Sequence, residues 1–319
     1  MRAIIFDGQL RYTSDQADPR PDPDECVVQV HMAGICATDL NITRGYMNYR
    51  GVLGHEMVGT VVEGSKAWRG KRVAAEINCV CRRCDLCQAG LSNHCRRRTV
   101  LGILGRDGCF ADFVAVPERN LHAVPDTISD EEAVFIEPLA AAYQVIMQVP
   151  IEPRLRVAVV GTGRLGLLVA QVLATTGCSL QVVGRNPKTL LFCEKKQIQS
   201  TAIDDLIPRH DRDVVVECSG APAGLDIALS LVRPRGTIVL KSTHRGQAPL
   251  DLAPAVVNEV TILGSRCGPF ADAINALARR DIDVSSMVAR AYKIDRGPEA
   301  FAASEDPQNI KVLLKVNPR

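Results

Sequence analysis

Three separated stretches of the chain carry side chains of the kind that bind zinc. His55 and Glu56 stand side by side between glycines in GVLGHEMVG, residues 51–59, while Cys36 lies upstream in GICATD and Glu137 downstream in FIEPLA. A lone histidine on an apolar strand is usually a structural residue. A thiolate, an imidazole and a carboxylate together, however, match an open catalytic zinc site with one position left for water or substrate. The sequence therefore predicts such a site.

Four cysteines form a second candidate metal site, with the spacing Cys81-x2-Cys84-x2-Cys87-x7-Cys95. Four thiolates close a tetrahedral shell and leave no open position, so we expect a structural zinc. Cys79 and His94 could each replace a member, although the regular spacing favours the four. The surrounding arginines could contact nucleic acid, but the segment has no aromatic residues for base stacking. We therefore expect no nucleic-acid partner.

A third motif, GTGRLG, has the G-x-G-x-x-G spacing of a dinucleotide-binding loop and lies between a predicted strand and a predicted helix. Gly161 would make the tight turn, Gly163 would let the backbone approach a pyrophosphate, and Gly166 would let helix and strand pack closely. The phosphates would lie at the helix N-terminus, at Arg164 and Leu165. A simple glycine turn is the alternative interpretation.

The end of the next strand favours NADP(H) over NAD(H). The acid that usually binds the adenosine ribose would fall at Gly184, and no carboxylate stands there. Arg185 follows at once, and Lys188 lies one turn later. Absence of the acid relieves repulsion with a 2′-phosphate, and the two cations attract it. The alternative is that Arg185 stacks on the adenine, which would permit either cofactor.

The composition is that of a globular protein of two domains. The chain has 319 residues, is 46% hydrophobic and has a net charge of +2, so nothing points to nucleic acid or a membrane surface. No apolar run approaches the ~18 residues of a membrane span. Twelve cysteines without an export signal indicate metal binding rather than disulfides, and a cytoplasmic protein.

The elements that must position these residues change in character near residue 154. The earlier part is typical of short strands and loops, with strands expected at residues 26–33, 59–62, 72–75 and 107–116. The later part alternates strands and helices, which predicts a parallel sheet covered on both faces. Its strands are expected at residues 156–160, 180–183, 214–217 and 237–240, and its helices at residues 165–176, 188–195 and 225–232. A helix at 270–280 and a strand at 310–316 should follow.

Taken in order, these motifs resemble those of the zinc-dependent medium-chain dehydrogenases, the family of alcohol, sorbitol, glucose and threonine dehydrogenases. The resemblance covers essentially the whole chain and runs through GICATD, GHE-x2-G, the four cysteines, EPLA, GTGRLG, ECSG and IKVLLKV. It implies an α/β fold: a Rossmann doubly wound parallel sheet plus a mainly β GroES-like catalytic domain with a structural-zinc lobe. The implied parts are residues 1–142 for the catalytic domain with its lobe at 79–95, residues 143–267 for dinucleotide binding, and residues 268–319 returning to the catalytic domain.

The EPL triplet at Glu137 resembles the polyol and sugar dehydrogenase branch, in which Glu replaces a ligand cysteine. The resemblance implies Cys36, His55 and Glu137 as catalytic zinc ligands, with Glu56 as an alternate ligand that exchanges with water. Thr38 would accept the hydroxyl proton as hydride passes to the nicotinamide, or it would cap a helix.

The implied enzyme is an NAD(P)-dependent zinc dehydrogenase of alcohols, polyols or sugars, with a small-molecule substrate and a homodimeric or homotetrameric assembly. Two alternatives remain open. A catalytically inactive, cofactor-binding sensor or structural subunit would keep the same fold. A reductase of larger carbonyls is suggested by Asn41, which stands where many relatives have a histidine.

Overall fold

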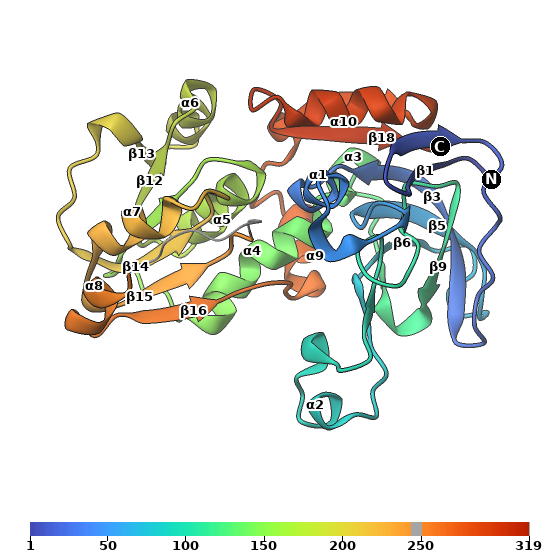
Figure 1. The fold of residues 1–319 in the computed structure, drawn as a ribbon, viewed down its shortest axis with the longest axis horizontal. Helices are drawn as coiled ribbons and strands as arrows, with labels where there is room; N and C mark the ends of the chain where they lie inside the picture. The colour runs from blue at the N-terminus through green and yellow to red at the C-terminus, as the bar shows by residue number, and fades with distance from the viewer. Residues whose placement is uncertain (244–250, 319) are drawn as a thin grey trace. The chain divides into compact units, whose positions relative to one another are not determined.

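The computed structural model describes residues 1–243 and 251–318, which divide into two compact units (Figure 1). The first unit comprises Met1–Glu137, Phe270–Arg280 and Val284–Arg319, and the second comprises Pro138–Pro269 and Asp281–Asp283. Within the described residues, no helix is both long enough and apolar enough to span a membrane.

The first unit is built around β3 (Glu25–Gly34), which is mostly buried along its length. It pairs antiparallel with strands from both ends of the sequence, including the C-terminal β18, whose Leu313 lies opposite Gly34. The sheet order is β10-β6-β5-β3-β18-β17, with β9 also on β3, and a separate sheet has the order β2-β1-β4. The strands are β1 (Ala3–Phe6), β2 (Leu10–Thr13), β4 (Gly51–Val52), β5 (Met57–Glu63), β6 (Arg72–Ala75), β9 (Phe113–Pro117), β10 (Leu121–Ala123), β17 (Val288–Lys293) and β18 (Lys311–Lys315).

Short helices and a ribbon complete this unit. In Figure 1 the segment around α2 extends away from the strands of its own unit. We call residues 79–95 the cysteine lobe. The elements are α1 (Ala37–Thr43), the ribbon of β7 (Asn78–Cys79) and β8 (Thr99–Val100), α2 (Asp85–Gln88), the 3₁₀ helix η2 (Ser92–His94), α3 (Asp130–Ala133), α9 (Phe270–Ala278) and α10 (Gly297–Glu305).

One strand prediction in the first unit is wrong over the first half of its range. Residues 107–116 were predicted to be extended throughout, but regular strand occurs only in β9, from Phe113. The backbone N–H groups of Gly108, Cys109 and Phe110 instead donate to carbonyl groups of residues 52–54. This close pairing of two backbones at glycines replaces the regular ladder, and its partner is distant in sequence.

The second unit contains the predicted parallel sheet, in the order β13-β12-β11-β14-β15-β16. All of its strand pairs are parallel, and its core is lined by small and branched residues such as Val160, Val183 and Val215. The strands are β11 (Arg156–Val160), β12 (Ser179–Gly184), β13 (Gln199–Ala202), β14 (Arg212–Glu217), β15 (Val232–Leu240) and β16 (Thr261–Gly264). The helices are α4 (Ile136–Gln148), α5 (Arg164–Ala174), α6 (Pro187–Lys195), α7 (Gly224–Leu231) and α8 (Ala253–Val257). The strand order is that of a doubly wound fold, as expected.

Candidate metal and cofactor sites

Cys36, His55 and Glu56 come together in the first unit. Each offers a ligand atom, and these atoms all lie within 4.8 Å of one another. His55 and Glu56 are almost completely buried, and Cys36 is half-buried. Sulfur, imidazole nitrogen and carboxylate oxygen are all donors that zinc accepts, so the donor set fits this metal.

Asp39 organises two of these residues. Cys36 is the N-cap of α1, and its backbone N–H donates to Asp39 Oδ2 at 2.8 Å. The other carboxylate oxygen, Oδ1, lies 3.2 Å from Nδ1 of His55, and neither of these two buried atoms has a well-aligned hydrogen bond among the described residues. Because Nδ1 faces Asp39, Nε2 is left for a metal, and an outer carboxylate of this kind orients a ligating imidazole.

The electrostatics of this site favour a cation beside His55. Burial lowers the pKa of His55, but the neighbouring Asp39 and Cys36 raise it by a larger amount. The pKa of His55 therefore lies well above its ordinary value. The ring therefore sits in a field that stabilises positive charge. A bound metal ion would therefore compete with a proton for the His55 ring.

Besides being a candidate metal ligand, Glu56 has a buried ion-pair partner that was not predicted from the sequence. Lys311, on β18, forms an ion pair with Glu56 Oε2, and its Nζ also lies 3.4 Å from the carbonyl oxygen of Ile35. Gly34 makes room for the pair, because a Cβ there would lie 2.6 Å from Glu56 Oε2. A lysine within the apolar run IKVLLKV was the available signal, since a buried lysine needs a counter-charge.

Two further predicted residues lie near this site or at the boundary of the unit. Thr38 is half-buried on α1, and its Oγ1 lies 3.8 Å from Cys36 Sγ. Glu137 is half-buried in the first turn of α4 and is the last residue of the first segment of the first unit. It is not among the described residues whose ligand atoms share the 4.8 Å cluster, so its role as a ligand stays a prediction.

The four cysteines of the lobe converge in the same way. Cys81, Cys84, Cys87 and Cys95 offer sulfurs within 4.8 Å of one another, with Cys95 Sγ 3.5 Å from that of Cys81. Backbone N–H donors lower the pKa of Cys81 to about 6 and also lower that of Cys84, whereas desolvation raises the pKa of Cys87 to about 11. Four sulfurs this close together, two of them favoured as thiolates by backbone donors, fit a structural zinc.

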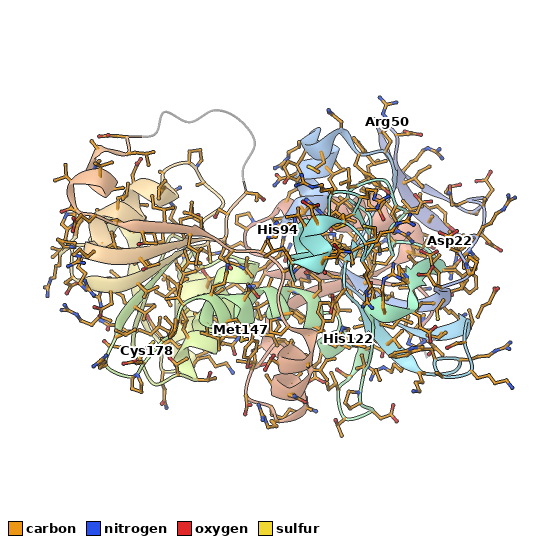
Figure 2. All side chains as sticks on the ribbon, turned by 90° about the horizontal axis from the view of Figure 1, so that it is seen from below. Asp22, Arg50, His94, His122, Met147 and Cys178 are labelled. Carbon is orange, nitrogen blue, oxygen red and sulfur yellow. The ribbon has the colours of Figure 1, made fainter. Side chains whose placement is uncertain are left out.

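Neither spare donor belongs to this cluster. His94 is exposed on η2 (Figure 2). Cys79 is buried at the stem of the lobe, where Asn120 Nδ2 lies 3.8 Å from its sulfur, and burial raises its pKa to about 11. The cluster therefore consists of the four cysteines predicted from their spacing in the sequence, and Cys79 is a structural thiol.

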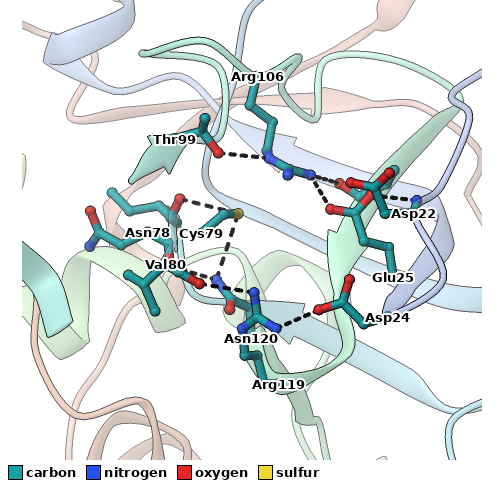
Figure 3. A network of polar contacts seen from close by, with 12 residues as sticks. Asp22, Asp24, Glu25, Asn78, Cys79, Val80, Thr99, Arg106, Arg119 and Asn120 are labelled. Carbon is teal, nitrogen blue, oxygen red and sulfur yellow. Dashed lines mark hydrogen bonds and ion pairs between the residues drawn. The ribbon is translucent and has the colours of Figure 1, made fainter. Parts of the chain in front are cut away.

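The stem of the lobe is tied to the start of β3 by two arginines (Figure 3). Arg106 donates to Glu25 Oε1 at 2.6 Å and to Thr99 Oγ1 at 3.0 Å. Arg119 pairs with Asp24 at 2.5 Å and donates to the carbonyl oxygen of Val80 at 2.9 Å. These bonds hold the ribbon that carries the lobe to the central sheet of the first unit.

In the second unit, GTGRLG joins β11 to α5, as predicted. Gly161 has φ of +108° and packs so closely on residues 218–219 that a Cβ would lie 2.6 Å from Ser219 Cα. Gly166 lies against the carbonyl of Gly161, where a Cβ would be 2.1 Å from the oxygen, whereas nothing lies within 4 Å of a Cβ at Gly163. Gly163 caps α5, and Arg164 and Leu165 form its first turn. The open space at this helix N-terminus suits a phosphate.

The predicted determinants of cofactor choice follow β12. Gly184 ends that strand, and Arg185 and Lys188 are both exposed beyond it. Asn186 caps α6 and accepts a hydrogen bond from the N–H of Lys188 at 3.0 Å. The two cations thus lie at the start of one helix, at the carboxyl edge of the parallel sheet.

Comparison with known proteins shows the family of the chain. The family described as "Alcohol dehydrogenase GroES-like domain" matches residues 22–126, and that described as "Zinc-binding dehydrogenase" matches residues 165–280. A sorbitol dehydrogenase of Halalkalibacterium halodurans is 27% identical, over 94% of each chain. A Sinorhizobium meliloti crystal structure with NADP bound has a TM-score of 0.87 at 27% identity, over 98% of each chain. An Escherichia coli structure complexed with NADH, named as a short chain alcohol dehydrogenase, has a TM-score of 0.89 at 26% identity, over 99% of each chain.

The fold, the two clusters of candidate metal ligands and these matches define a class of two-unit, nicotinamide-dependent oxidoreductases. The chain belongs to the zinc-dependent medium-chain dehydrogenase/reductase family. The predicted fold class, a Rossmann sheet with a GroES-like domain, is confirmed, and so is the expectation of an enzyme that uses zinc and a nicotinamide cofactor.

Proposed function

We propose that the protein interconverts a small polyol or sugar alcohol and the corresponding carbonyl compound, with NADP(H) as the preferred cofactor. The observation that carries the proposal is the convergence of Cys36, His55 and Glu56 in the first unit. The sorbitol dehydrogenase relative supports the polyol class, and the exposed cations Arg185 and Lys188, with no acid at Gly184, support NADP(H). Residues 1–142 and 268–319 would serve catalysis, and residues 143–267 the cofactor.

In this proposal Cys36, His55 and Glu137 hold the catalytic zinc, with Glu56 as an alternate ligand. A zinc ion bound there would supply a Lewis acid for the substrate oxygen, and a bound nicotinamide would supply the hydride acceptor. Asp39 keeps the His55 ring oriented with Nε2 toward the metal. Thr38, beside Cys36, would accept the proton of the substrate hydroxyl while its own hydroxyl proton passes to water. Lys311 balances the charge of Glu56 when that carboxylate is not a ligand.

The test is a Cys36→Ser variant, assayed for zinc content and for NADP-linked oxidation of a panel of polyols. We expect one fewer zinc ion per chain than in the parent, with loss of turnover, because a hydroxyl is a poor zinc ligand. Cys178→Ser, in the second unit, is the matched control and should keep both. Unchanged zinc and turnover in Cys36→Ser would refute the site, and cofactor binding without turnover on any substrate in the parent would favour a sensor.

The cofactor preference needs a separate measurement. Fluorescence titration of the parent should show tighter binding of NADPH than of NADH, because Arg185 and Lys188 attract the 2′-phosphate. Tighter binding of NADH would overturn the preference and leave the zinc site unaffected.

We also propose a homodimer or homotetramer in the cytoplasm. Val256 and Val257 on α8 are 75% and 80% exposed, and β16, which follows α8 in sequence, is the last strand of the parallel sheet among the described residues. Exposed apolar side chains and a strand at the edge of a sheet are typical of a contact between copies. The structure describes all twelve cysteines, and none forms a disulfide, which supports a reducing compartment. Light scattering of the purified protein would test the assembly.

A further inference from the structure

Gly184 lies against Thr162, the residue in the middle of the glycine-rich loop. Gly184 is buried at the end of β12, and its φ is outside the left-handed region, so its backbone conformation would accept any residue. Space is what excludes a side chain. A Cβ at this position would lie 2.4 Å from Cγ2, 2.5 Å from Oγ1 and 3.0 Å from Cβ of Thr162.

Sheet register places these two residues against each other. Val160 lies beside Val183 in the parallel pair of β11 and β12, and the N–H of Gly161 donates to the carbonyl of Val183 at 2.8 Å. The glycine-rich loop begins where β11 ends, and β11 ends beside the last residues of β12. Thr162 is consequently held over the end of β12 by the main chain.

The Thr162 side chain cannot easily turn aside. It is 7% exposed, and its branched Cβ restricts χ1. Its hydroxyl shares a buried hydrogen bond with that of Thr189, 2.6 Å away, and Thr189 Oγ1 also lies 2.9 Å from the carbonyl oxygen of Asn186. Moving Thr162 would therefore break a buried chain of polar contacts that also holds the first turn of α6.

From this packing we infer that Thr162 is a determinant of cofactor selectivity, because it denies position 184 the carboxylate that would bind a free adenosine ribose. The inference rests on the proposed NADP(H) preference. The cofactor preference would then have two causes. Arg185 and Lys188 attract the 2′-phosphate, and Thr162 excludes an acidic side chain that would repel this phosphate. A change of position 184 alone should then fail to convert the site.

The experiment compares Gly184→Asp with the double variant Gly184→Asp, Thr162→Gly by titration with NADH and NADPH and by thermal unfolding. The single variant should bind both cofactors poorly and melt below the parent, because the new side chain meets Thr162. The double variant should bind NADH about tenfold or more tightly than the single variant does. It should also bind NADPH more weakly than the parent, because the carboxylate repels the 2′-phosphate.

Two controls separate space from hydrogen bonding. Gly184→Asp with Thr189→Ala removes the hydroxyl that holds Thr162 but leaves the Thr162 atoms in place, so it should recover less NADH binding than the double variant does. Thr162→Gly alone opens the space without an acid, and its affinities for NADH and NADPH are the reference against which those of the double variant are compared.

The inference is overturned if Gly184→Asp alone binds NADH as tightly as the double variant, or if the double variant gains nothing in NADH binding or melting temperature. If the single variant does not fold and the double variant does, the clash is supported directly. If neither folds, Thr162 is not what excludes the side chain. A parent that prefers NADH would refute the proposed NADP(H) preference, whereas the comparison of single and double variants would still test the clash.

Discussion

Lys311 and Glu56 form an ion pair in which each side chain is only 1% exposed, although 255 positions separate them in the chain. A charge pair buried this completely is costly to create and more costly to break, because the remaining charge has no solvent. It couples the C-terminal strand β18 to the residue that follows His55. Changes to either partner should therefore affect stability and the metal site together.

Lys311→Met should lower the free energy of unfolding by about 3–5 kcal/mol, the usual result of leaving one buried charge unpaired. Denaturant titration of the metal-loaded protein measures this loss. The double variant Lys311→Met, Glu56→Gln removes both charges and should recover much of it. A single variant as stable as the parent would show that the pair contributes nothing.

Asp39→Asn should weaken the binding of zinc at the Cys36–His55 site by about 10- to 100-fold, because the imidazole loses the carboxylate that orients it. Competition with a chelator would measure the affinity. Asp7→Asn, an exposed carboxylate paired with Arg11, is the control and should leave zinc binding unchanged. Equal affinities in Asp39→Asn and the parent would remove Asp39 from the site.

Cys84→Ser should release the metal of the cysteine lobe and lower the melting temperature, while its direct effect on hydride transfer should be small. Metal analysis should find one zinc ion fewer per chain. Cys79→Ala serves as the comparison, because Cys79 lies at the stem and outside the cluster of four sulfurs. It should retain all of its zinc, and a loss there equal to that in Cys84→Ser would mean that the ligand set is wrong.

Asp130 should make the protein sensitive to acid. Burial raises the pKa of Asp130, but the imidazole of His31, 3.3 Å away, and the guanidinium of Arg72 lower it by a larger amount. The net pKa therefore lies below its ordinary value of 3.8. Its ionised form therefore stabilises the fold fully above about pH 4, and this contribution is lost as the pH falls from there toward the folded-state pKa.

Urea denaturation between pH 7 and pH 3 would test this dependence in the parent and in Asp130→Asn. The variant should be less stable at neutral pH, because Arg72, which is 7% exposed, loses a partner 2.7 Å away. The difference between the two proteins should shrink as the pH falls below about 4. A difference that stays constant over this range would contradict the assignment.

Motifs that are local in sequence were predicted well. The four lobe cysteines fall within residues 81–95, and the glycine-rich loop spans residues 161–166, so chain geometry alone limits where their atoms can lie. Periodicity likewise placed β11, α5 and β14, because buried strands and amphipathic helices repeat their apolar residues at fixed intervals. The strands β13 and β16 were not foreseen, since the partial burial of these short segments leaves a weak apolar pattern.

The sequence by itself therefore determined the class of fold, the kinds of donor atom and the presence of a nucleotide loop, because each depends on residue types at short range. Only the tertiary structure decided which distant atoms meet. It paired Lys311 with Glu56 by laying β18 beside β3, and it set Thr162 over Gly184 by the register of β11 and β12. Such contacts follow from strand order and register, which depend on the packing of the whole unit and leave no local pattern in the residues concerned.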